Sequence, residues 1–173
     1  MRLPIILLLL VLTTLSCENS EKQKSTTYYF IRHAEKERGP NVGSDPLLTE
    51  KGMERAKFWA NYFEDKNIDA VYSTDTKRTR ATAKPTTEKF NLTTLTYDAQ
   101  DMYNASFKEK TMGKTVLIVG HSNTTPQFVN KILGKEQYEA IDDSEFGIVF
   151  KVTLDEEGNS NVEKKTINSW DTL

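Results

Sequence analysis

This chain of 173 residues has two histidines, and each lies just beyond the C-terminal end of a short apolar run. His33 comes after Arg32 and the aromatic run 28–31, whereas His121 follows a Val- and Ile-rich run that ends in glycine. Such runs indicate buried strands, and the carboxyl ends of parallel strands form the ligand crevice of α/β sheets. Arg78 lies beyond a third apolar stretch. We therefore expect two imidazoles and two guanidinium groups to converge on one small anion.

The residue types at these strand ends suit a phosphoryl group. Phosphoryl transfer spreads negative charge over the equatorial oxygens, so positioned cations supply much of the catalysis. A guanidinium keeps its charge and can hold two oxygens at once, which a lysine cannot do. A neutral imidazole can act as a nucleophile and form a covalent intermediate. The plainer alternative is that Arg32 and His33 are ordinary residues at the end of a strand.

Four segments, in this order along the chain, resemble the motifs of the histidine phosphatase (phosphoglycerate mutase-like) superfamily, in particular its small bacterial members. They are Arg-His-Ala-Glu at 32–35, the run from Asp45 to Ala56, the run from Ser73 to Ala83, and Gly-His-Ser at 120–122. The chain departs from the family pattern at Ala34, where the family most often has glycine.

The resemblance implies a role for each of the four residues. His33 would be the nucleophile that forms a phosphohistidine, which water then hydrolyses. His121 would contact the transferring oxygens, and Arg32 and Arg78 would bind the phosphate with it. This chemistry needs no metal ion and no other cofactor.

The proton donor to the leaving oxygen is less clear, although an acidic side chain is the usual choice. In the family the donor often lies after the Arg-Thr motif, which points to Asp98 or Asp101. Glu35, two residues from His33, is the local alternative. Asp98 is our first choice, and the competing interpretation of each carboxylate is a solvated surface acid.

Strand and helix patterns alternate along the chain. We expect strands at 28–31, 68–72, 92–97 and 114–120, helices at 49–65, 75–90 and from Thr125-Pro126 to Gly134, and a hairpin of 146–154 with 161–167. In the first helix Met53, Ala56, Trp59, Ala60 and Phe63 form an apolar stripe that predicts a core-facing side. Pro85 should kink or split the second helix. This order predicts an α/β fold, a three-layer α/β/α sandwich around a mostly parallel sheet with a C-terminal β-hairpin.

The first residues are typical of a signal segment. Met1-Arg2 is positive, 5–12 is an apolar core too short to span a bilayer, and Leu15-Ser16-Cys17 resembles a bacterial lipoprotein cleavage site. We expect a signal segment at 1–17 with cleavage before a lipidated Cys17, a polar tether at 18–25 and one domain at 26–173. Ordinary signal cleavage and an uncleaved anchor are the alternatives. The chain has one cysteine, so it forms no intrachain disulfide.

The charge of the chain argues against one class of partner, nucleic acids. The net charge of −2 and the isoelectric point near 5.8 argue against a nucleic-acid-binding face, which needs clustered basic charge. We expect a metal-independent phosphatase in the bacterial cell envelope, facing the periplasm or the exterior, that acts on a small phosphorylated substrate and meets the membrane only through its lipid anchor. The alternatives are a non-catalytic anion-binding lipoprotein, a phosphoglycerate mutase-like phosphotransferase, and a metal hydrolase using His33 and His121. The sequence does not predict an oligomeric state.

Overall fold

A six-stranded sheet runs through the part of the chain that the computed structural model describes, residues 25–167. Its strands are β1 (Thr26–Arg32), β2 (Ala70–Ser73), β3 (Thr94–Thr96), β4 (Thr115–Gly120), β5 (Ile148–Leu154) and β6 (Ser160–Thr166). Their order is β3-β2-β4-β1-β5-β6. The first four strands are parallel, and β5 and β6 form an antiparallel hairpin at one edge. The mostly parallel sheet and its C-terminal hairpin confirm the predicted fold class.

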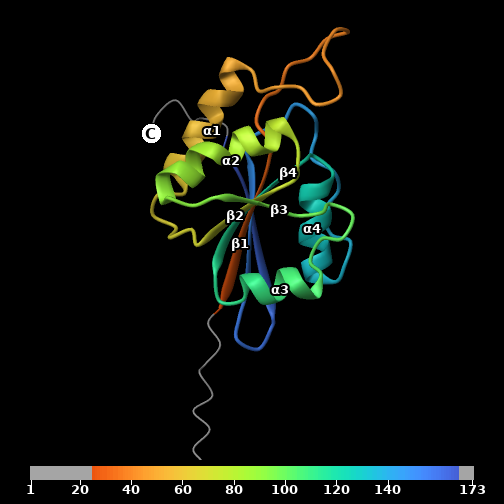
Figure 1. The fold of residues 1–173 in the computed structure, drawn as a ribbon. Helices are drawn as coiled ribbons and strands as arrows, with labels where there is room; N and C mark the ends of the chain where they lie inside the picture. Colours follow the sequence, from red (N-terminus) through yellow and green to blue (C-terminus); the bar gives the residue numbers. More distant parts are fainter. Residues whose placement is uncertain (1–24, 168–173) are drawn as a thin grey trace, which may run out of the picture.

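Helices cover both faces of this sheet. They are α1 (Glu50–Tyr62), α2 (Lys77–Phe90), α3 (Ala105–Thr111) and α4 (Thr124–Leu133). Figure 1 shows α1 and α2 on one face and α3 and α4 on the other. The predicted three layers are therefore present.

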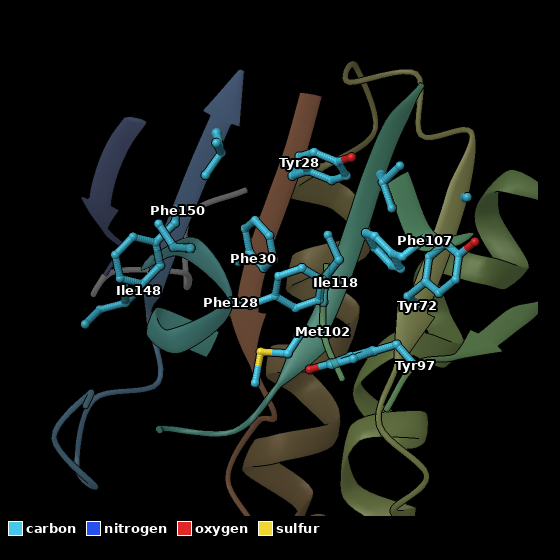
Figure 2. Close-up of a cluster of buried hydrophobic side chains, with 14 of the residues drawn as sticks. Tyr28, Phe30, Tyr72, Tyr97, Met102, Phe107, Ile118, Phe128, Ile148 and Phe150 are labelled. Atoms are coloured by element: carbon cyan, nitrogen blue, oxygen red, sulfur yellow. The ribbon is translucent and has the colours of Figure 1, made fainter. Parts of the chain in front are cut away.

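The two faces of β1 supply two separate cores, because successive side chains of a strand point to opposite sides. Tyr28 and Phe30 pack in the cluster under α3 and α4, and Tyr29 and Ile31 pack in the cluster under α1 and α2. In the first cluster the rings of Phe30 and Phe128 lie 5.1 Å apart between centroids (Figure 2). A central strand that is buried on both sides gives the residues at its end a fixed position.

The helices α1 and α2 differ from expectation in two details. Met53 is 49% exposed, so the predicted stripe begins one turn later, and Gly52 and Arg55 are buried instead because they face the loop after β1. The helix α2 is one continuous element with Pro85 inside it, so Pro85 does not split it. Proline removes one backbone hydrogen bond, and the burial of a row of α2 side chains against α1 and the sheet offsets that loss.

The sequence patterns predict no helix where α3 lies. This helix has only seven residues, two of them buried, and its apolar pattern is too short to read. Asn104 caps it by accepting a hydrogen bond from the Phe107 amide at 2.9 Å. The remaining elements match their predicted ranges, with ends that differ by a few residues.

A small third cluster ties the loop after β1 to the helices α1 and α2. Ala34 is fully buried and packs with Leu48 and Ala56, and the partly buried Ala81 adds to it. The methyl group of Ala34, where the family most often has glycine, therefore fills space between two helices.

The predicted signal segment, the lipidated Cys17 and all but the last residue of the tether lie outside the described residues, and they stay predictions. Within residues 25–167 no helix is both long and apolar enough to cross a membrane.

Candidate active site

The carboxyl ends of three neighbouring parallel strands place the four predicted residues together. Arg32 is the last residue of β1 and pairs in register with Gly120, the last residue of β4. His33 and His121 follow these two residues, and the His33 amide donates to the Gly120 carbonyl at 2.8 Å. The two imidazole rings lie 5.5 Å apart between centroids. Arg78 reaches the same place from the first turn of α2, which begins shortly after β2 ends.

His33 is held in one orientation by the backbone of its own loop. Its Nδ1 lies 2.8 Å from the carbonyl oxygen of Ala34, and only a protonated nitrogen can donate to a carbonyl. The other ring nitrogen, Nε2, then carries the lone pair. Burial lowers the pKa of His33 to about 3, and the charge of Arg32 acts in the same direction, whereas the bond to Ala34 opposes it. The imidazole is thus neutral near pH 7, as a nucleophile must be.

His121 is oriented by a chain of hydroxyl groups. Its Nε2 lies 2.9 Å from the Thr74 hydroxyl, which donates to the Thr79 hydroxyl at 3.0 Å, which in turn donates to the Thr74 carbonyl at 2.8 Å. Each hydroxyl has one proton to give, so Nε2 of His121 must be the donor. Its Nδ1 faces Arg78 Nη2 at 3.3 Å. Burial, followed by the charge of Arg78, lowers the pKa of His121 to about 4.

Arg78 is shared between His121 and a carboxylate. Its Nη1 donates to Asp45 at 3.1 Å, and the Lys77 amide makes a bifurcated hydrogen bond to the same carboxylate, 3.1 Å from each oxygen. Asp45 therefore lies at the N-terminus of α2, where the helix dipole and free amides favour an anion. The buried Nε of Arg78 has no acceptor among residues 25–167.

Arg32 is held by hydrogen bonds to the segment that leads into β5. It is 1% exposed, and its Nη1 donates to the carbonyls of Asp142 and Glu145 at 2.8 and 3.0 Å. Its Nη2 donates to the Asp143 carboxylate at 3.0 Å. Arg38 pairs with the same carboxylate at 2.5 Å, and Arg38 and Arg32 together lower the pKa of Asp143 to about 2. Within the described part of the chain the buried Nε of Arg32 has no acceptor.

Both arginines thus keep one buried N–H group that the described residues do not satisfy. Buried donors are nearly always hydrogen-bonded in native proteins, so an unsatisfied one calls for an explanation. An oxyanion next to the two guanidinium groups would satisfy both groups.

The three candidate proton donors lie apart from this cluster in their contacts. Asp98 is exposed and accepts a hydrogen bond from the Gln100 amide at 2.8 Å, and Asp101 is bonded to Asn104. Glu35 turns its carboxylate toward α1, where Arg55 holds both oxygens. Across residues 25–167, no hydrogen bond or ion pair joins any of the three to His33 or His121.

Sequence reasoning missed several residues that hold the site. Asp45, Thr74 and Thr82 lie inside motifs that carry the family resemblance, so a signal for them was present. Asp143 has no such signal, because its contact with Arg32 joins residues 111 positions apart. Among residues 25–167, no group of three or more His, Cys, Asp or Glu side chains could hold a metal ion.

Comparison with known sequences supports one family. Residues 28–101 match the histidine phosphatase superfamily, branch 1. Phosphoserine phosphatase 1 of Hydrogenobacter thermophilus is 38% identical over 73 residues, which are 39% of this chain and 34% of that protein. The chain thus matches about a third of the length of this relative.

Solved structures share the fold over most of their length. The protein histidine phosphatase SixA complexed with tungstate superposes with a TM-score of 0.62 at 17% identity, over 81% of this chain and 96% of that chain. Phosphoserine phosphatase from Entamoeba histolytica, in complex with 3-phosphoglyceric acid, gives 0.60 at 16% identity, over 83% and 98%. Phosphoglycerate mutase from Bacillus anthracis gives 0.59 at 16% identity, over 87% and 96%. The stretch that matches the family model includes His33 and Arg78, and the described chain shares its fold with these solved structures.

Proposed function

We propose that the protein is a metal-independent phosphatase that hydrolyses a phosphomonoester through a phosphohistidine on His33. The observation that supports this most directly is the state of His33. The imidazole is buried and neutral, and its Nδ1 is committed to the Ala34 carbonyl, so Nε2 presents its lone pair beside His121. The proposal that the enzyme takes a small phosphorylated substrate rests on the same geometry.

The reaction balances in two steps. Nε2 of His33 attacks phosphorus, the ester P–O bond breaks, and the leaving oxygen takes a proton and departs as an alcohol. Water then attacks the phosphohistidine and gives one proton to the carboxylate that the donor became in the first step, the P–N bond breaks, and inorganic phosphate leaves while His33 becomes neutral again. In both steps the guanidinium groups of Arg32 and Arg78, with His121, would stabilise charge on the equatorial oxygens.

Asp98 remains our proposed donor of the proton to the leaving oxygen. Tyr97, the residue before it, donates its amide to the Ser73 carbonyl at 3.1 Å, which brings the start of this segment to the end of β2. General acid catalysis matters most for a poor leaving group. The variant Asp98→Asn should therefore hydrolyse an alkyl phosphate about 100-fold more slowly and p-nitrophenyl phosphate at nearly the normal rate. Asp101→Asn is the matched control, and the opposite pattern would assign the role to Asp101.

The test of the mechanism uses the purified chain, p-nitrophenyl phosphate and EDTA. We expect turnover that EDTA does not affect, and a phosphohistidine that mass spectrometry detects at alkaline pH. The phosphohistidine should form in His121→Asn, at a reduced rate, and be absent from His33→Asn. Loss of activity in EDTA, or a phosphoenzyme in His33→Asn, would contradict the proposal.

Two other outcomes would identify the alternatives. Transfer of the phosphoryl group to added 3-phosphoglycerate, in place of hydrolysis, would indicate a phosphoglycerate mutase-like phosphotransferase. Phosphate binding without turnover of any ester would indicate a non-catalytic anion-binding protein.

The place of action is a separate proposal, which the sequence of residues 1–17 supports. We propose that Cys17 is lipidated and anchors the domain in the bacterial cell envelope. Cells that express the protein should incorporate labelled palmitate into it, and Cys17→Ser should abolish the label. Label retained in that variant would exclude Cys17 as the acceptor.

A further inference from the structure

Glu35 and Arg55 form a buried ion pair directly behind the loop that carries His33. Arg55 Nε donates to Glu35 Oε2 at 2.8 Å, and its Nη2 donates to Oε1 at 2.7 Å. The two side chains are only 13% and 8% exposed. A forked, charge-assisted pair of this kind fixes both position and angle. Lys51 adds a weaker contact at 3.8 Å.

The backbone of Glu35 is held from the same side by the start of α1. Its carbonyl accepts a hydrogen bond from the Thr49 amide at 3.0 Å. Gly52 lies so close that a Cβ atom there would be 2.1 Å from the Glu35 carbonyl oxygen. Thr49, Gly52 and Arg55 are spaced by three residues along one side of α1, so a single helix face grips Glu35 at three points.

This grip leads directly to the nucleophile. The Ala34 carbonyl, which accepts the Nδ1 proton of His33, belongs to the peptide group that joins Ala34 to Glu35. The preceding peptide is fixed as well, because the Ala34 amide donates to the Thr82 hydroxyl at 2.9 Å. The peptide groups on both sides of the one that joins Ala34 to Glu35 are thus held, and the Ala34 carbonyl between them lies against Nδ1 of His33.

We infer that Glu35 and Arg55 are positioning residues for His33: they hold the Ala34 carbonyl so that Nδ1 keeps the proton and Nε2 keeps the lone pair. This inference rests on the proposed function only in taking His33 as the nucleophile. It gives Glu35 a role other than that of the proton donor, since both of its oxygens are engaged by Arg55. The acceptor for the nucleophilic histidine is thus a backbone carbonyl, and the carboxylate acts one step behind it.

The test uses the tautomer of His33, which NMR reads without any turnover. The chain has two histidines, so with ¹⁵N labelling and no histidine tag the imidazole spectrum is simple, and His121→Asn assigns it. In the wild type His33 should give the pattern of a single Nδ1–H tautomer. In Glu35→Gln we expect signals of both tautomers, a kcat that is 10- to 100-fold lower and a KM within about twofold of normal. Arg55→Lys, which keeps the charge but not the fork, should lie between.

A matched control and a second variant keep the test decisive. Glu163→Gln removes one partner of the exposed pair with Lys151 on the hairpin and should change neither the spectrum nor kcat. Glu35→Gln removes the charge of Glu35 from the buried ion pair and is expected to be less stable, so Glu35→Gln/Arg55→Gln, with two amides in place of the ion pair, is measured beside it. A folded variant that keeps the single Nδ1–H tautomer and a normal kcat would overturn the inference. If the wild type hydrolyses no ester, the proposed function fails, while the spectra still decide the role of the pair.

Discussion

The buried His33 and the partly buried His121 should make folding stability depend on pH in a range where few other groups titrate. The pKa of His33 falls to about 3 and that of His121 to about 4 in the folded protein, both mainly through burial, whereas an unfolded histidine titrates near 6.5. Above pH 6.5 both states are neutral and the histidines contribute no pH dependence. Below pH 6.5 the unfolded chain binds protons that the folded protein does not bind. The free energy of unfolding therefore decreases as the pH is lowered.

The size of the effect follows from the two shifts. Each pH unit below 6.5 costs about 1.4 kcal/mol per histidine until the folded pKa is approached. At pH 5 the loss is therefore about 2 kcal/mol for each histidine and about 4 kcal/mol in total. Asp143 does not contribute in this window, because its pKa lies near 2 in the folded protein and near 3.8 otherwise.

Urea denaturation at pH 7, 6 and 5, in a buffer without phosphate, measures this slope through the buried Trp59. His33→Asn and His121→Asn should each remove about half of it, and the double variant should remove nearly all. A wild-type slope no steeper than that of the double variant would refute the claim that the fold keeps both imidazoles neutral.

Three further predictions concern the residues around the histidines. Gly52→Ala should lower the free energy of unfolding by at least about 2 kcal/mol, because its Cβ would clash with the Glu35 carbonyl. Gly43→Ala is the control, because a Cβ there meets no atom within 4 Å. Equal stability of the two variants in urea would contradict this prediction. Asp45→Asn removes the negative charge that pairs with Arg78, so inorganic phosphate should bind about fivefold more tightly, as measured by calorimetry. Weaker binding would instead show that Asp45 serves to orient the guanidinium. Arg78→Lys keeps the charge but loses the fork, so phosphate affinity should fall about tenfold, and unchanged affinity would show that charge alone suffices.

The parts of the fold that the sequence predicted are those with a strong local pattern. The apolar runs of β1 and β4 and the long stripe of α1 fixed the main layers, because each pattern spans enough residues to have one interpretation. The helix α3 was missed because seven residues with two buried side chains give no readable period. Local propensity alone predicts a kink or a split at Pro85, and the packing of α2 on α1, which that propensity does not include, keeps the helix unsplit.

At the candidate site, too, the local patterns could be predicted and the long-range contacts could not. The meeting of His33, His121 and Arg78 could be expected, since strand ends of a parallel sheet share one edge. The contacts that orient them could not, because they join distant parts of the chain. Asp143 reaches Arg32 across 111 positions, and the Thr74 hydroxyl reaches His121 across 47. No local pattern encodes such pairs.

The packing of Ala34 limits which residue types the helices α1 and α2 can carry beside the loop that follows β1. Its methyl group occupies the space left by small residues at 56 and 81. A larger residue at either helix position would compete for the same volume, and the simplest compensation is glycine at 34. Related sequences should therefore show covariation, with alanine at 34 accompanied by alanine or glycine at 56 and 81, and glycine at 34 accompanied by bulkier residues. The choice between glycine and alanine beside the nucleophile would then report on helix packing, and it would carry no information about substrate.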